Sequence, residues 1–127
     1  MQQHATQAYQ TTAKRTGSPR DLEANLLSKS ATNLQRIRDA WDLADTELLG
    51  ALKFNRKLWN VFLNSATNED NPLPAAIRQN IANLGLFVLS HTIRLEAKPD
   101  ATGLDVLINI NREVAAGLRA SQLGGAT

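Results

Sequence analysis

The chain has 127 residues, which suits one domain that buries roughly two-thirds of its unfolded surface and needs no metal or disulfide to hold its core. It contains no cysteine, which excludes disulfides, thiolate metal sites and cysteine nucleophiles, and its two histidines are too few for a zinc site. The net charge of +2 is too small to indicate a nucleic-acid-binding protein.

The beginning of the chain predicts a soluble, cytoplasmic protein. Residues 1–15 lack the apolar stretch that an export signal requires. The longest apolar run, LGLFVL at residues 84–89, is far shorter than the roughly 20 residues that cross a bilayer. Residues 4–15 are mostly polar, with Tyr9 as the only large apolar residue, and we expect them to become helical only when docked.

The first long helix is predicted to begin at residues 17–19. Gly17 breaks the preceding segment, Ser18 can cap the helix, and Pro19 suits the first helical position. Large apolar residues then recur at steps of three and four residues, or sums of them, which is the period of a helix and not of a strand. This stripe consists of Leu22, Leu26, Leu34, Ile37, Trp41, Leu48, Leu52, Trp59 and Phe62.

Residues 19–67 can form either one long helix or two. The sequence DLAD at residues 42–45 contains weak helix formers, and Asp45 can cap a new helix, so we place a break there. The sequence NEDNPLP at residues 68–74 is a stronger break, because prolines and turn-forming residues are incompatible with a helix interior.

Two further helices are predicted after this loop. The segment between residues 74 and 98 is apolar around most of its circumference, so we expect it to be the most buried helix. A last amphipathic helix is expected from about residue 102 to residue 120, followed by a disordered tail at residues 121–127. Residues 1–120 are therefore predicted to form a single all-α domain, a bundle of four main helices plus a short N-terminal helical segment.

No motif in the sequence predicts catalysis or cofactor binding. The glycines form no phosphate-binding loop. Two pairs of neighbouring acidic residues, Asp42 with Asp45 and Glu69 with Asp70, lie where capping and solvation explain them better than acid–base chemistry. His91 is interpreted as a partly buried histidine bonded to a nearby backbone group. We therefore expect no enzyme activity, no cofactor and no metal.

The densest group of residues typical of protein interfaces is ALKFNRKLWNVF at residues 51–62. Tryptophan and arginine are enriched at interface hot spots, although core packing alone accounts for Trp59 and Phe62. Phe54 and Leu58 lie round the helix from that stripe, so we expect them to flank the core or to face a partner.

Asparagines inside the last two helices have two open explanations. Asparagine is a mediocre helix former, so its presence there needs a reason. Hydrogen bonds between helices that fix the register of the bundle are one explanation, and recognition of a partner is the other. The residues concerned are Asn80, Asn83, Asn109 and Asn111.

Four segments, taken in order, carry a resemblance to a known family. They are AYQTTAKRTGSPRDLEANLL (8–27), ALKFNRKLWNVF (51–62), NPLPAAIRQNIANLGLFV (71–88) and VLININ with AAGLR (106–119). The ordered set, above all FNRKLW followed by NPLP and RQNIANL, resembles the FlaF family, the flagellar biosynthesis regulators of alphaproteobacteria. The resemblance extends from about residue 8 to residue 119.

The resemblance implies a role in flagellin supply. Proteins similar to this one support flagellin secretion and filament assembly, act alongside the translational regulator FlbT, and are thought to bind flagellin before export. We expect an apolar groove near Phe54, Leu58 and the adjoining third helix, with Arg56 and Lys57 at its rim. The candidate partner-binding residues are Tyr9, Arg20, Phe54, Asn55, Arg56, Leu58, Trp59, Arg78, Asn80 and Asn83.

Two rival functions remain open from the sequence. The alternative is a post-transcriptional regulator of flagellin synthesis that acts on or near messenger RNA together with FlbT, although the charge balance disfavours it. It would contact phosphate through Lys14, Arg15, Arg20, Arg36 and Arg38. The other rival is a component that self-associates through the helix containing Trp59.

Overall fold

Four long helices make up most of the protein. The computed structural model describes residues 19–43 and 46–125, with side chains at 20–42 and 46–120. The helices are α2 (Pro19–Asp39), α3 (Leu48–Ala66), α4 (Ala75–Ala97) and α5 (Ala101–Gly125), and a short 3-10 helix, η1 (Trp41–Leu43), follows α2. The described residues contain no strand, so the predicted all-α bundle of four main helices is confirmed. The N-terminal segment with Tyr9 lies outside them.

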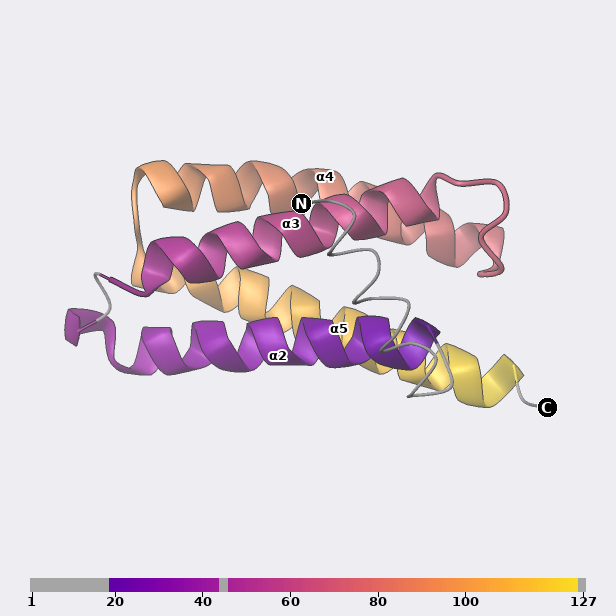
Figure 1. Ribbon diagram of the computed structural model, residues 1–127, viewed down its shortest axis with the longest axis horizontal. Helices are drawn as coiled ribbons and strands as arrows, with labels where there is room; N and C mark the ends of the chain where they lie inside the picture. Colours follow the sequence, from indigo (N-terminus) through magenta and orange to yellow (C-terminus); the bar gives the residue numbers. More distant parts are fainter. Residues whose placement is uncertain (1–18, 44–45, 126–127) are drawn as a thin grey trace.

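The helices form an up-and-down bundle, in which consecutive helices run in opposite directions (Figure 1). The most extensive packing is between α2 and α5 and between α3 and α4, whereas α2 with α3 and α4 with α5 make fewer contacts. The fold is therefore two antiparallel helix pairs packed against each other, with the α3/α4 pair above the α2/α5 pair in Figure 1. The first and last described helices are neighbours, which closes the bundle.

The break between the first two helices lies where the sequence predicts it. Helix α2 ends at Asp39, η1 occupies Trp41–Leu43, and α3 begins at Leu48. Residues 19–67 therefore form two helices and not one. The expected capping residue Asp45 lies outside the described residues, and Glu47 stands at the N-cap of α3.

The proline-containing loop at residues 67–74 is held together by asparagine side chains. Asn71 Nδ2 donates to the carbonyl oxygen of Ser65 at 3.0 Å, and Asn71 Oδ1 accepts from the backbone N–H of Leu73 at 2.8 Å. Leu73 is buried, so this predicted break also contributes a side chain to the core. These bonds satisfy backbone groups that no helix provides for.

The predicted apolar stripes form the core. On α2 and α3 most members of the first stripe are buried, and Leu26 and Trp41 pack against them half-exposed. Helix α5 buries Leu104, Leu107 and Leu118 on the face that the sequence predicts. The spacing of apolar residues therefore indicates correctly which side of each of these helices faces inward.

Helix α4 departs from expectation, because it is not the most buried helix. The bundle covers only the side that carries Ile81, Val88 and Leu95. Leu86 and Ile93 remain 64% and 51% exposed. At about 100° per residue these two side chains lie about 120–180° round the helix from those three, where the bundle places no helix against them.

The end of α5 also differs from expectation. The helix continues to Gly125, beyond the expected end at residue 120, so it takes in part of the segment that was expected to be a disordered tail. Residues 126 and 127 lie outside the described part of the chain. Within that described part, every helix is too short or too polar to cross a membrane.

Candidate partner-binding surface

A buried network of polar side chains joins the four long helices at the centre of the bundle. Asn55 of α3 accepts through Oδ1 from Ser30 Oγ of α2 at 2.9 Å and from Asn111 Nδ2 of α5 at 2.8 Å. Asn55 Nδ2 donates to Thr92 Oγ1 of α4 at 3.5 Å. Asn111 Oδ1 accepts from Trp59 Nε1 at 2.8 Å. Each of these side chains is at most 1% exposed.

This network limits how the helices can pack. A buried amide or indole N–H without a partner costs about 1–3 kcal/mol, so sliding one helix along another would leave several such groups unpaired. Thr92 Oγ1 also donates to the carbonyl oxygen of Val88 at 2.6 Å, so its hydroxyl both donates and accepts. For Asn111, the interpretation as a bond between helices that fixes the register is therefore confirmed.

Three of the expected partner-binding residues are core residues instead. Asn55 and Trp59 are fully buried, and Leu58 is 7% exposed. Trp59 also packs edge-on against Phe62, with ring centroids 5.6 Å apart. In this fold the network and the core face of α3 cover these three residues, so none of them lies on the surface. Trp59 likewise has no exposed surface for self-association.

Phe54 and Arg56 lie on opposite sides of α3. Arg56 Nε pairs with Glu96 Oε1 of α4 at 3.1 Å, so the side of α3 that carries Arg56 faces α4. Phe54 precedes Arg56 by two residues, about 200° of helix, so it projects away from α4, and it is 36% exposed. The expected groove between the Phe54 edge and the third helix therefore does not exist as one surface.

The remaining candidates are spread over the bundle. Arg78 Nη1 donates to the carbonyl oxygen of Asn68 at 3.3 Å, so it braces the loop before α4. Asn80 and Asn83 are exposed on α4, and Asn83 Oδ1 accepts from Gln79 at 3.1 Å. Arg20 is half-exposed at the start of α2. Tyr9 lies outside the described residues.

The exposed apolar residues of α4 are a feature that the sequence reasoning missed. Ala82, Leu86, Leu89 and Ile93 follow one another at steps of four, three and four residues, so they lie within an arc of about 60° on the helix. We call these four residues the α4 stripe. Leu86 and Ile93 are exposed, and Ala82 and Leu89 are half-exposed. The signal of the α4 stripe in the sequence is apolarity all round the helix, which is also the pattern of a deeply buried helix.

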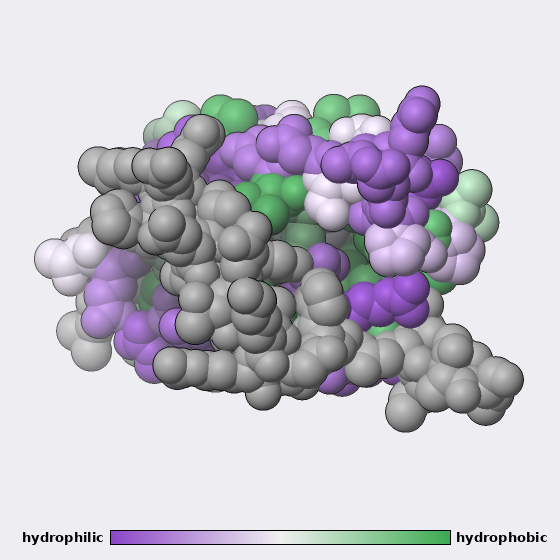
Figure 2. All heavy atoms as spheres, turned by 45° about the vertical axis from the view of Figure 1, so that its right-hand side comes forward, coloured by the Kyte–Doolittle hydropathy of each residue, from purple (hydrophilic) through white to green (hydrophobic). Residues whose placement is uncertain are grey.

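A row of α3 residues borders the α4 stripe. Its members recur with the same alternation of four and three residues, and they are Leu49, Lys53, Arg56, Asn60 and Leu63. Arg56 reaches Glu96, and Leu63 lies against Gly85, whose Cβ position would be 3.4 Å from Leu63 Cδ1. The row therefore faces the same side of the molecule as the stripe. Figure 2 shows apolar side chains beside polar ones along its upper edge, the region of α3 and α4.

A pocket of about 270 Å³ lies at the end of the bundle where α3 begins and α4 ends. Its walls are mostly apolar and come from η1, α3 and α4 and the residues just beyond α4. They are Trp41, Leu48, Leu49, Leu52, Leu95, Glu96 and Pro99. Small-molecule sites usually enclose about 300–1,000 Å³, so this pocket lies at the lower end of that range and has room for one bulky side chain.

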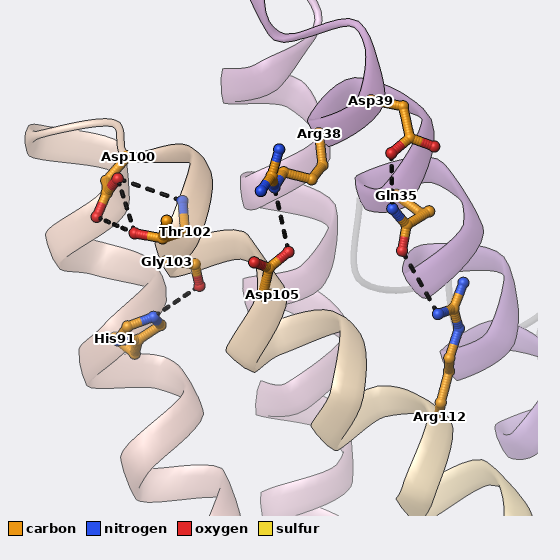
Figure 3. A network of polar contacts seen from close by, with 9 residues as sticks. All are labelled: Gln35, Arg38, Asp39, His91, Asp100, Thr102, Gly103, Asp105 and Arg112. Carbon is orange, nitrogen blue, oxygen red and sulfur yellow. Dashed lines mark hydrogen bonds and ion pairs between the residues drawn. The ribbon is translucent and has the colours of Figure 1, made fainter.

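The start of α5 is fastened to both of its neighbours (Figure 3). Asp100 Oδ1 accepts from the backbone N–H of Thr102 at 3.2 Å and so caps the helix. His91 Nε2 lies 2.9 Å from the carbonyl oxygen of Gly103, which only accepts, so Nε2 carries the hydrogen. On the other side Arg38 Nε pairs with Asp105 Oδ1 at 3.2 Å. The interpretation of His91 as a histidine bonded to backbone is confirmed.

The arginines assigned to RNA contact in the rival function are paired where the structure describes them. Arg36 Nη1 lies 2.6 Å from Glu47 Oε2, and Arg38 pairs with Asp105. Because these acids partly neutralise both cations, the described part of α2 offers no continuous basic stripe. Lys14 and Arg15 lie outside it. Among the residues that the structure describes, no three His, Asp or Glu side chains gather in a way that could hold a metal ion.

An up-and-down four-helix bundle with an apolar stripe open to solvent defines a small all-α protein with a surface suited to a partner. The sequence pattern of the FlaF family of flagellar proteins matches residues 5–118 of the chain, which is most of its length. The protein belongs to this family. No significant match was found among curated proteins or among solved structures.

Proposed function

We propose that this protein binds flagellin in the cytoplasm and covers its apolar segments until export, without catalysing a reaction. Family membership supports a role in flagellar biology. The observation that carries the proposal is the α4 stripe, of which two side chains, Leu86 and Ile93, are more than half exposed although the same helix buries Val88 and Leu95 in the core. Exposed apolar side chains that gather on one face are typical of protein interaction sites.

The physical reason concerns the state of flagellin before assembly. Its terminal segments are amphipathic and pack as helices only inside the filament, so in the cytoplasm they expose apolar faces. A helical bundle with an open apolar face can cover such a segment. Folding of the segment on binding costs part of the interaction energy, and this keeps the complex releasable. A functional link to FlbT belongs to the same proposal, because flagellin held in a complex is a measure of flagellin supply.

Isothermal titration calorimetry with purified monomeric flagellin tests the proposal. We expect saturable binding with a negative heat-capacity change, the mark of buried apolar surface. Preassembled filaments serve as the control, because their terminal segments are already packed, and we expect no binding to them. Absence of any heat from the monomer, together with tight binding to the leader of flagellin messenger RNA in a gel-shift assay, would favour the RNA-linked regulator instead.

A further inference from the structure

We propose that the outer face of the α3/α4 pair binds one α-helix whose apolar stripe is flanked by acidic residues, and that the pocket beside it receives an anchoring side chain of that helix. This inference rests on the proposed function, since it takes the helix to be a terminal segment of flagellin. It adds the surface, the secondary structure of the partner and the sign of its charge.

The spacing of the α4 stripe indicates that the occupant is a helix. Its steps of four, three and four residues are those with which one helix packs along another at a small crossing angle. The stripe spans about 17 Å at 1.5 Å per residue, or about three turns of a partner helix. The α3 row runs beside it, and we call the outer face between the row and the stripe the trough, on which a third helix can lie.

The pocket continues this trough at one end. Glu96 follows Ile93 by three residues and extends the register of the α4 stripe, and it is also part of the pocket wall. Leu49, the first member of the α3 row, lines the pocket too and is 47% exposed. A helix lying along the stripe would therefore end over the pocket, where a bulky apolar side chain can be buried. Deeply seated anchors of this kind contribute most of the affinity at protein interfaces.

The charges on these two helices select an acidic partner. Helices α3 and α4 carry five Lys/Arg and one Asp/Glu, a net charge of +4. The single acid, Glu96, is already paired with Arg56. Lys53, in the α3 row, is exposed beside the trough. Acidic residues on the flanks of a partner helix would meet this field, which favours both the encounter and the correct register.

The same charges argue against a second copy of the chain as the occupant. Two copies facing each other through this surface would bring Lys53 and Arg56 of one close to those of the other, and like charges across an interface are unfavourable. A membrane surface would also be attracted by cations, but it would leave the pocket without an occupant. A single acidic helix uses the stripe, the pocket and the charge together.

Calorimetry with monomeric flagellin and two matched pairs of variants tests this inference. Leu86→Ser combined with Ile93→Ser removes the two most exposed side chains of the stripe, and Val61→Ser is its control, because Val61 is 52% exposed on the side of α3 away from α4. Lys53→Glu reverses a charge beside the trough, and Lys29→Glu makes the same change on an exposed residue of α2, outside the α3/α4 pair. All of these side chains are exposed, so the variants should fold, which circular dichroism verifies.

We expect the double serine variant to bind at least about tenfold more weakly than wild type, and Lys53→Glu about threefold to tenfold more weakly at low salt. Both controls should remain within about twofold of wild type. Unchanged binding by the double serine variant overturns the inference while leaving flagellin binding intact. A wild-type protein that does not bind flagellin overturns the proposed function and this inference together. Two other outcomes refute the proposal that a helix binds here. If light scattering shows a concentration-dependent dimer that the serine variant abolishes, the occupant is a second copy of the chain. If the serine variant loses binding to anionic vesicles but still binds flagellin, the occupant is a membrane surface.

Discussion

Replacing Asn111 by leucine tests whether the central polar network determines the stability of the bundle. The change keeps a side chain of similar size but removes two hydrogen bonds, each 2.8 Å long. Asn55 Oδ1 keeps its bond from Ser30, so it remains satisfied. Trp59 Nε1 loses the acceptor that the structure gives it, and its side chain is fully buried, so water cannot replace that acceptor.

The expected loss of stability follows from this orphaned donor. A buried N–H without a partner costs about 1–3 kcal/mol, and burying leucine in place of an amide offsets part of this. We expect a net destabilisation of about 1–2 kcal/mol. In a Trp59→Phe background no indole N–H remains to be orphaned, so the same Asn111→Leu change should cost about 1 kcal/mol less.

Urea denaturation followed by circular dichroism of the four proteins in this cycle measures both values. With a slope of about 2 kcal/mol per molar urea, the Asn111→Leu midpoint should fall by roughly 0.5–1 M. Equal costs of Asn111→Leu in the wild-type and Trp59→Phe backgrounds would show that the bond to Trp59 contributes nothing, and the reasoning about register would then be refuted.

Three further predictions concern two glycines, one core leucine and one ion pair. Gly117→Ala should stabilise the protein by about 0.5–1 kcal/mol, because nothing lies within 4 Å of the added Cβ. Gly103→Ala should destabilise it by about 1 kcal/mol or more, because its Cβ would lie 2.6 Å from Leu95 Cδ2. Thermal unfolding compares the two variants, and equal effects would contradict the packing argument. Leu58→Asp should lower the free energy of unfolding by more than about 3 kcal/mol, since it buries an unpaired charge at a site that is 7% exposed. Urea denaturation measures this loss, and a variant as stable as wild type would show that Leu58 faces solvent. The coupling energy between Arg56 and Glu96 is measured with glutamine at either position and at both. It should stay below about 1 kcal/mol and decrease with salt, because the Arg56 side chain is 37% exposed. A larger, salt-independent value would indicate a desolvated pair.

Local chemistry in the sequence was sufficient to predict the helices and their inward sides. Clusters of prolines and turn-forming residues end helices, so the loop at 67–74 and the short connection before α5 lie where expected. Apolar residues at helical spacing face inward on α2, α3 and α5 because burying them is the main favourable term in folding. The family resemblance depends on the same ordered segments and agrees with the match over residues 5–118.

The placement of polar residues needed the tertiary structure. Asn55 and Asn111 are ordinary polar residues in the sequence, and only the approach of four helices turns them into a buried network. Phe54 and Arg56 lie on opposite sides of α3 by helix geometry alone, and only the position of α4 decides that Arg56 is the one that faces it.

What the sequence by itself determined is the set of helices, their ends and the core stripes of three of them, because these depend on interactions within a few residues. What only the tertiary structure decided is which side of α4 is left without a neighbour. Leu86 and Ile93 are as apolar as Val88, yet the bundle has only enough helices to cover one side of α4. Burial depends on the positions of distant segments, and the candidate binding surface is what their packing leaves uncovered.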